Sequence, residues 1–172
     1  MKRHLIFVGL PGSGKSTVGK AVGEQLGADF LDLDQVIERK HGMPVERIFA
    51  EQGEPAFRQV EASTMVSMLA GDPCVIATGG GWAAQPGEIE RAKERGFLIY
   101  LKTMITTAVE RTKLHDYRPL LMSDDPYAKM RELLEEREQF YLKANAEVNN
   151  GPRPLDEVVQ EAVATARSQA GW

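Results

Sequence analysis

The segment Gly9 to Ser16, which reads GLPGSGKS, limits what this chain can fold into more than any other feature. It fits the pattern G-x-x-x-x-G-K-[ST], follows the apolar run Leu5 to Val8 and precedes a stretch with helical spacing. Glycines in this context let backbone N–H groups turn inward around phosphate oxygens at the N-terminus of the next helix. An ordinary glycine turn is the alternative, but it does not explain why Lys15 and Ser16 fall in register. We therefore predict a strand, a phosphate-binding loop and a helix.

The same motif predicts the kind of nucleotide site. Lys15 is expected to reach the terminal phosphates, and the Ser16 hydroxyl to ligate Mg²⁺. The chain has no Asn-Lys-x-Asp guanine motif, since the nearest segment, 112–116, has the wrong spacing. The apolar run 74–78 ends in Thr and three glycines rather than in the Asp of many P-loop ATPases. We predict ATP and Mg²⁺ as cofactors, in a phosphoryl transfer whose acceptor the loop does not identify.

Short apolar runs alternate with amphipathic stretches along the chain, which is typical of an α/β fold with a parallel sheet covered by helices on both faces. The expected strands are 5–8, 30–33, 74–78 and 97–101, with a weaker fifth at 146–148. After a first helix that Gly27 ends, the expected helices are 34–41, 45–51, 55–70, 86–95, 104–112, 127–145 and 155–169.

Composition excludes several classes of protein. With 172 residues the chain fits one domain, and its net charge of −4 leaves no global basic footprint for nucleic acid. The single Cys74 excludes a disulfide framework and a multi-cysteine zinc site and suits a reducing cytoplasm. No apolar run is long enough for a membrane span. We expect a cytoplasmic monomer without nucleic-acid or membrane partners.

Two carboxylates follow the second expected strand, where open α/β sheets place their ligands. Asp32 and Asp34 alternate along an extended chain, so we expect both side chains on one side of the strand. One is suited to hold Mg²⁺ through water beside Ser16, and the other to accept or orient the proton of an acceptor hydroxyl. Alternatively, Asp34 caps the helix that begins near Gln35.

Two further features suggest an anionic acceptor. Gly79-Gly80-Gly81 follows a buried strand and can offer N–H donors at close range, although a plain loop is the alternative. In the helix at 127–145, Arg137 interrupts the apolar stripe and is expected to point inward, which requires a carboxylate or a bound anion. Arg58 stands three residues before Glu61, which can hold its guanidinium. Two inward arginines predict a carboxylate-bearing acceptor, whereas solvent-facing arginines are the commoner alternative.

The segment 113–126 carries Arg118 before Pro119 and is predicted to be an exposed loop that can act as a mobile lid. A mobile arginine near a triphosphate can stabilise charge in the transition state, although a plain surface arginine fits the sequence equally well. Trp82, Phe49 and Phe57 can line an acceptor pocket, but aromatic side chains more often belong to the core.

With these motifs in place, nearly the whole chain resembles the shikimate kinase family of small P-loop kinases. The resemblance rests on the loop 9–17, Asp32-x-Asp34, Ile48-Phe49 with Gly53-Glu54 and Phe57-Arg58-x-x-Glu61, the glycines 79–81, Arg118-Pro119-Leu120-Leu121, and Glu136-Arg137 followed by Tyr141. It implies one domain over residues 1–172, with a five-stranded parallel sheet, acceptor-binding helices at about 34–61 and the lid at about 113–125.

The resemblance also implies the activity, which is ATP-dependent phosphorylation of the 3-hydroxyl of shikimate in aromatic amino-acid biosynthesis. The implied catalytic residues are Lys15, Asp34 and Arg118, with Asp34 as the base, and the implied Mg²⁺ ligands are Ser16 and Asp32. Implied nucleotide contacts are Gly12, Ser13, Gly14, Lys15, Ser16, Thr17, Arg111, Arg118 and, with a one-residue shift, Pro154. Implied shikimate contacts are Asp34, Arg58, Gly80, Gly81 and Arg137, with Glu61 orienting Arg58.

Trp82 departs from the family, in which a small residue usually follows the three glycines, so the indole is expected to narrow or reshape the acceptor pocket. The lid sequence at 113–117 is also unusual in character. Two other functions remain open. One is a gluconate-type or other small-molecule kinase, whose acceptor does not need to be bound by the arginine clamp, which is the pair Arg58 and Arg137. The other is a nucleotide-dependent binding protein without turnover.

Overall fold

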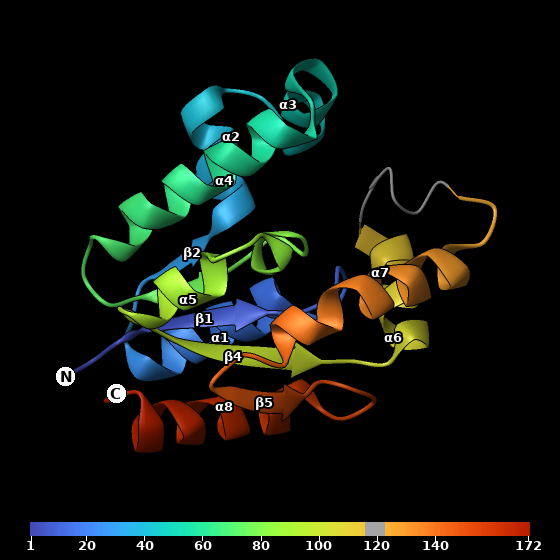
Figure 1. The fold of residues 1–172 in the computed structure, drawn as a ribbon. Coiled ribbons are helices and arrows are strands. Elements are labelled where there is room, and N and C mark those ends of the chain that lie inside the picture. Colours follow the sequence, from blue (N-terminus) through green and yellow to red (C-terminus); the bar gives the residue numbers. More distant parts are fainter. Residues whose placement is uncertain (116–122) are drawn as a thin grey trace.

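The computed structural model of the protein describes residues 1–115 and 123–172 and contains a central sheet with helices on both faces (Figure 1). Within these residues the sheet has five strands in the order β2-β3-β1-β4-β5, and all neighbouring strands are parallel. The strands are β1 (His4–Val8), β2 (Phe30–Asp32), β3 (Val75–Ala77), β4 (Gly96–Lys102) and β5 (Ala146–Asn149). Each predicted strand agrees with an observed one to within one residue at either end.

The helices of the described residues also follow the predicted pattern. They are α1 (Lys15–Leu26), α2 (Leu33–His41), α3 (Val45–Gln52), α4 (Glu54–Leu69), the short 3₁₀ helix η1 (Trp82–Ala84), α5 (Glu88–Lys93), α6 (Ile105–His115), α7 (Pro126–Tyr141) and α8 (Leu155–Gln169). The predictions missed η1 and extended α7 to residue 145. Asn145 has already joined the sheet, because its N–H and its side-chain oxygen both bond to the backbone of Leu98 at 2.9 Å.

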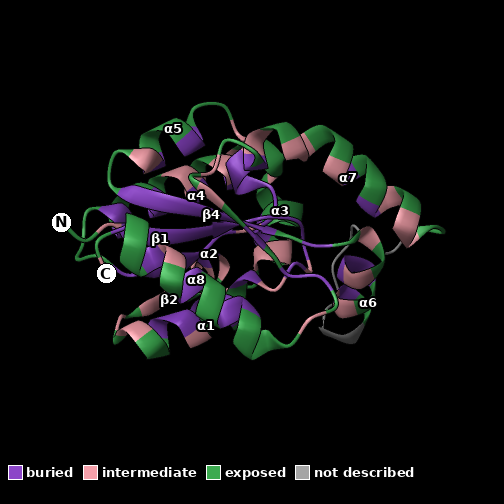
Figure 2. Cartoon of the chain, turned by 90° about the horizontal axis from the view of Figure 1, so that it is seen from below, coloured by how far each residue is buried: buried purple, intermediate pink, exposed green. Residues whose placement is uncertain are grey.

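The core forms on both faces of the sheet because the strand side chains alternate. In β1, Leu5 and Phe7 pack with apolar residues of α1 and α8, whereas Ile6 and Val8 pack with α4, α5 and α7 on the opposite face. Figure 2 shows the central strands buried along their length, with exposed residues on the outer sides of the helices. A strand buried on both faces has to be apolar throughout, which explains the continuous runs in the sequence.

The connections after β1 and β3 leave the sheet on opposite faces. The first leads to α1, which packs on the face of α8, and the second leads to η1 and α5 on the other face. Since β1 and β3 are neighbours, a crevice opens between the loops at their carboxyl ends, and this is where sheets of this type bind ligands. The phosphate-binding loop and the three glycines 79–81 occupy these two positions.

Within the described part of the chain, no helix has the length and apolar character that a membrane crossing requires.

His4 is a buried titratable residue at the start of β1, with 1% of its surface exposed. Its Nδ1 accepts a hydrogen bond from the Cys74 N–H at 3.3 Å, and its Nε2 has no partner among the described residues. Burial lowers the pKa of His4 below its ordinary value, and the charge of Arg95 acts in the same direction against nearby backbone carbonyls.

We predict that this histidine makes the fold sensitive to acid. Because its pKa is lower in the folded state than the ordinary value of about 6.5, the unfolded chain binds the proton first as the pH falls. Above the unfolded pKa of about 6.5, His4 is neutral in both states and costs no stability. Below it, the free energy of unfolding decreases by at most about 1.4 kcal/mol per pH unit, until the pH reaches the lower pKa of the folded state. When the free energy of unfolding is measured at several pH values between 8 and 5, it should decrease more steeply with falling pH for the wild type than for His4→Leu. The variant His41→Gln, in α2, should retain the wild-type profile, and parallel profiles for the wild type and His4→Leu would contradict the prediction.

Candidate active site

The loop between β1 and α1 has the conformation of an anion cradle. Gly14 caps α1 in the left-handed region at φ 90°, without a side-chain cap, so the first N–H groups of the helix remain directed outward. Gly12 also has a positive φ of 76°, and a Cβ there would overlap the Ala108 carbonyl oxygen. Glycine is therefore required at these two positions of the loop by its backbone angle, and at Gly12 also by the lack of space for a side chain. The Lys15 ammonium lies against the same loop and donates to the carbonyl oxygens of Gly9 at 2.9 Å and Leu10 at 2.8 Å.

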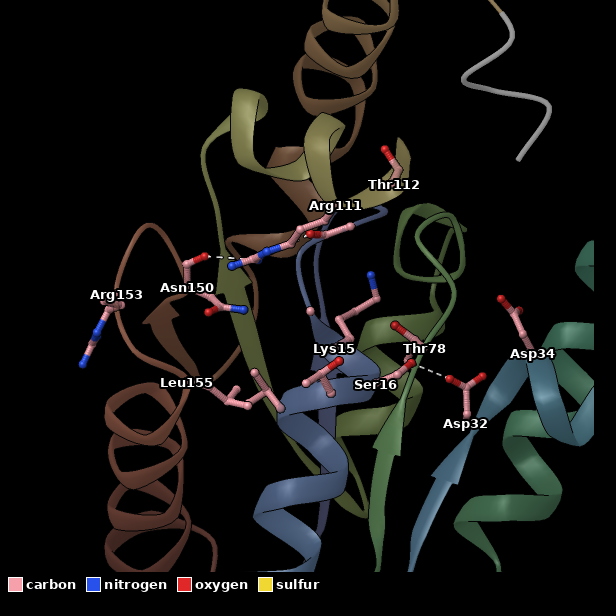
Figure 3. Close-up of a pocket in the computed structure, with 14 residues that line it drawn as sticks. Lys15, Ser16, Asp32, Asp34, Thr78, Arg111, Thr112, Asn150, Arg153 and Leu155 are labelled. Atoms are coloured by element: carbon pink, nitrogen blue, oxygen red, sulfur yellow. Dashed lines mark hydrogen bonds between the residues drawn. The ribbon is translucent and has the colours of Figure 1, made fainter. Parts of the chain in front are cut away.

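A cavity of about 390 Å³ opens above the loop, at the carboxyl ends of the strands (Figure 3). It is lined by Gly12, Gly14, Lys15, Ser16, Thr17, Val18, Asp32, Asp34, Thr78, Arg111, Thr112, Asn150, Arg153 and Leu155. Of the expected nucleotide contacts, Ser13 is buried beneath the cavity and Pro154 does not line it, although both neighbours of Pro154 do. Arg118, together with most of the predicted lid, lies outside the described residues.

Asn150 and Arg111 close the cavity from the side of β5 and α6. The Asn150 side chain donates to the Ser13 carbonyl at 2.7 Å, and Arg111 Nη1 lies 3.4 Å from the same oxygen and 3.4 Å from Asn150 O. Burial lowers the pKa of Arg111 from its ordinary value. The sequence prediction named Arg111 but missed Asn150. Its position directly after the fifth strand, at the edge where ligands bind, was the available signal.

Ser16 and Asp32 face each other across the crevice between α1 and β2. The Ser16 hydroxyl donates to Asp32 Oδ2 at 2.5 Å, and Asp32 Oδ1 accepts from the Gln35 N–H at 3.2 Å, which makes Asp32 the N-cap of α2. The alternative in which Asp34 is the cap is therefore wrong. The expectation that both carboxylates lie on one face of a strand is also wrong, because β2 ends at Asp32 and Asp34 lies in the first turn of α2.

The oxygen pair of Ser16 and Asp32 suits Mg²⁺, which prefers hard oxygen ligands. In the described residues, no group of three or more His, Cys, Asp or Glu side chains could enclose a metal ion. This agrees with a metal held by one or two protein oxygens together with phosphate and water, which is how Mg²⁺ usually binds beside nucleotides.

The glycine loop 79–81 lies where the three predicted acceptor-binding side chains converge with Glu61, which was predicted to orient Arg58. A Cβ built on Gly79 would lie 3.1 Å from Glu61 Oε2 and 3.2 Å from Asp34 Oδ1. A Cβ on Gly80 would lie 3.3 Å from Arg137 Nη1, and one on Gly81 would overlap Arg58 Nη2. None of these glycines has a positive φ, so glycine is needed here because charged side chains approach the backbone closely.

Gly80 also joins this group of side chains to the phosphate-binding loop. A Cβ on Gly80 would lie 2.8 Å from Cδ and 2.9 Å from Cγ of Pro11, which follows β1. The loop that holds phosphate and the loop beside the arginines are thus in contact through Pro11 and Gly80.

Arg58 is held by a buried carboxylate. Its Nη1 lies 2.5 Å from Glu61 Oε1, Glu61 is 1% exposed, and a second oxygen from Glu54 lies 3.3 Å from Nη2. Burial raises the pKa of Glu61 to about 7, and the Asp34 charge adds to this, while Arg58 and Arg137 oppose it. Arg58 Nε has no hydrogen-bond partner among the described residues. The alternative of a solvent-facing arginine does not hold for Arg58, whose side chain is 16% exposed.

Arg137 is half-buried on α7 and points toward Gly80. It forms no ion pair within the described residues, although its charge influences the pKa of Glu61 and of Tyr141. A half-buried guanidinium without a protein carboxylate is suited to a bound anion.

The three aromatic residues have different environments. Trp82 is 1% exposed, and its indole N–H donates to Glu88 Oε2 at 3.0 Å, so it belongs to the core and does not line the cavity. The interpretation of Trp82 as a core residue is therefore confirmed, and the expectation that it narrows or reshapes the acceptor pocket stays a prediction. Phe57 is also buried, whereas Phe49 is 40% exposed with its ring centre 5.6 Å from that of Phe57.

Comparisons with known proteins agree with this geometry. Residues 11–167 match the family model described as shikimate kinase. The shikimate kinase of Persephonella marina is 37% identical over 165 residues, covering 96% of this chain and 99% of that protein. The shikimate kinase of Cereibacter sphaeroides is 36% identical over 168 residues, covering 96% and 84%.

Solved structures extend the likeness to the fold. A shikimate kinase from Acinetobacter baumannii in complex with shikimate superposes with a TM-score of 0.92 at 34% identity, over 98% of this chain and 94% of that one. A gluconokinase from Sinorhizobium meliloti has a TM-score of 0.69 at 20% identity, over 99% and 94% of the two chains, which shows a shared fold alone.

The close approach of Arg58 to Gly81 generates a prediction about stability. In Gly81→Ala the new methyl group would overlap the guanidinium, so we expect a loss of about 1–3 kcal/mol in the free energy of unfolding. The control Gly71→Ala, whose nearest neighbour would be Met68 O at 3.5 Å, should cost less than about 1 kcal/mol. Urea unfolding in wild-type and Arg58→Ala backgrounds measures the coupling. The cost of Gly81→Ala should largely disappear without the guanidinium, and an equal cost in both backgrounds would contradict the contact.

Proposed function

The chain belongs to the shikimate kinase family, and on that basis we propose that it transfers the terminal phosphoryl group of ATP to the 3-hydroxyl of shikimate. The products are shikimate 3-phosphate and ADP, in the biosynthesis of aromatic amino acids. The observation that carries the proposal is the contact of the phosphate-binding loop, through Pro11, with a glycine loop flanked by Arg58 and Arg137. This contact supports the proposal of a nucleotide site beside a carboxylate site.

On the donor side, the N–H groups of the loop and the Lys15 ammonium bind the phosphates of ATP and balance the charge of the transferring group. Transfer of this kind would also draw on the positive charge of Mg²⁺ to neutralise the charge that develops on the phosphate oxygens. Ser16 and Asp32 are the residues that would hold it, since their oxygens are paired and line the cavity. Arg111 and Pro154 are proposed to flank the adenine. Arg118 is proposed to reach the transferring phosphoryl group, on the family resemblance alone.

On the acceptor side, Arg58 and Arg137 bind the shikimate carboxylate, with Glu61 fixing the Arg58 guanidinium. The N–H groups of Gly80 and Gly81 add backbone hydrogen bonds. Asp34 lines the cavity at the same loop and orients the ring hydroxyl, whose proton it accepts as the hydroxyl attacks phosphorus. Chemistry of this kind depends mainly on position and charge.

The same proposal covers the organisation of the chain. Residues 1–172 form one domain, in which the helices at about 34–61 contribute the acceptor side. We also propose that the protein is a cytoplasmic monomer. A single cysteine and a net charge of −4 support this proposal.

The experiment that tests the function is ADP release from the purified protein with Mg²⁺ and ATP. Shikimate, quinate, gluconate and no acceptor are compared, with EDTA added in a parallel series. We expect turnover with shikimate alone and none in EDTA, and Lys15→Ala should bind shikimate but not transfer phosphate. Turnover with gluconate would keep the mechanism and overturn the acceptor. Nucleotide binding without any turnover would indicate a binding protein.

The arginine clamp predicts a selective loss of acceptor affinity. Removing one charge-assisted contact costs about 1.5–3 kcal/mol, so Arg137→Ala should raise the KM for shikimate at least about tenfold. The KM for ATP should change little, because the nucleotide contacts lie on other elements. Steady-state kinetics with each substrate varied in turn provide the measurement. Arg131→Ala, an exposed position on the same helix, is the matched control, and an unchanged shikimate KM in Arg137→Ala would exclude the clamp.

A further inference from the structure

The carbonyl groups of the glycine loop all accept hydrogen bonds from the protein. Gly79 O accepts from the Trp82 N–H at 3.4 Å, Gly80 O from the Tyr141 hydroxyl at 2.6 Å, and Gly81 O from the Gln85 side chain at 3.0 Å. Among the described residues, the N–H groups of the same three glycines donate no hydrogen bond. The three carbonyl oxygens are therefore bonded within the protein, whereas the three N–H groups are suited to donate to a ligand.

The geometry of the peptide bond links these two observations. In a planar trans peptide, the carbonyl of one residue and the N–H of the next point in opposite directions, and the described chain contains no cis peptide. The Tyr141 bond to Gly80 O therefore fixes the direction of the Gly81 N–H. The Trp82 bond to Gly79 O fixes the direction of the Gly80 N–H in the same way.

The backbone of Trp82 is itself held from outside the loop. Its indole is 1% exposed and donates to Glu88 Oε2 at 3.0 Å, and Glu88 is buried and paired with Arg91. The Gln85 side chain holds the peptide between Gly81 and Trp82 by its carbonyl. The peptide planes of the loop are thus held by the Tyr141 hydroxyl and by the backbone of Trp82, whose buried indole is anchored at Glu88.

The Tyr141 hydroxyl also connects the loop to α7. Tyr141 is fully buried, and burial raises the pKa of its hydroxyl to about 12, so the group remains a donor at neutral pH. Arg137 lies one turn earlier on the same helix, with Nη1 beside Gly80. The hydrogen bond therefore keeps a backbone donor and a guanidinium in register with each other.

We propose that Tyr141 and Trp82 are positioning residues that aim the N–H groups of Gly81 and Gly80 at the acceptor. The inference rests on the proposed function, in which these N–H groups bind shikimate. Glycine peptides that are free to rotate would have to be ordered when the acceptor binds. A loop that is already held avoids this loss and binds more tightly.

The first test removes one oxygen atom. Tyr141→Phe should raise the KM for shikimate about tenfold, as expected when one hydrogen bond of ordinary strength is lost, while the KM for ATP stays within about twofold. The matched control is Tyr100→Phe. The Tyr100 ring lies 5.3 Å from that of Tyr141, it is 2% exposed, and its hydroxyl makes no hydrogen bond among the described residues. Both KM values should remain unchanged in the control.

The second test addresses the indole anchor. Glu88→Gln keeps an oxygen that can accept the Trp82 N–H, whereas Glu88→Leu does not. We expect a higher shikimate KM in Glu88→Leu and recovery toward the wild-type value in Glu88→Gln. The difference between the two should disappear in a Trp82→Phe background, because the donor is then absent.

The outcomes separate this inference from the proposed function. A wild type that phosphorylates shikimate, combined with a Tyr141→Phe variant that loses only thermal stability or changes both KM values equally, would overturn the inference and leave the function intact. Absence of shikimate turnover in the wild type would overturn both. If Tyr141→Phe does not fold, the pair Glu88→Leu and Glu88→Gln decides by the same criterion. A raised shikimate KM supports the inference, and unchanged constants overturn it.

Discussion

The arrangement of the site depends on one constraint, which is that β1 and β3 are neighbours whose following segments leave the sheet on opposite faces. The two loops therefore diverge above the sheet edge, and they remain in contact at Pro11 and Gly80. A cavity at this edge is a consequence of topology, and no side chain has to be displaced to create it. The phosphate-binding loop lines that cavity, whereas Arg58 of α4 and Arg137 of α7 lie at the glycine loop.

Electrostatics then select what the second loop can bind. Arg58 is paired with Glu61, which is almost completely buried, whereas Arg137 has no ion-pair partner in the part of the chain that the structure describes. The Arg137 guanidinium thus lies beside N–H groups that donate to no acceptor among the described residues. Burying such a group is unfavourable until an anion arrives, and the binding energy of the ligand offsets this cost.

Sequence reasoning succeeded where a feature is local. The phosphate-binding loop, the strand runs and the spacing of Arg58 and Glu61 all follow from residues within a few positions of one another, and the structure shows each of them. It failed where two local interpretations compete. Asp32 and Asp34 were expected on one face of a strand, but the helix begins one residue earlier than predicted and turns them apart. For Trp82 the sequence left a pocket position and a core position open, and the structure places it in the core, where a buried carboxylate six residues later accepts its indole N–H.

The sequence by itself determined the phosphate-binding loop, the alternating elements and the residues available for an acceptor site, because backbone preferences and hydrophobic periodicity act over short distances along the chain. Only the tertiary structure decided which of these residues meet. The Tyr141 hydroxyl reaches Gly80 O across 61 positions, and the Asn150 side chain reaches Ser13 O across 137. Such contacts follow from the order of strands in the sheet and from which face each helix covers. A pattern of apolar positions indicates that one face of an element is buried, but it does not indicate which other element packs against that face.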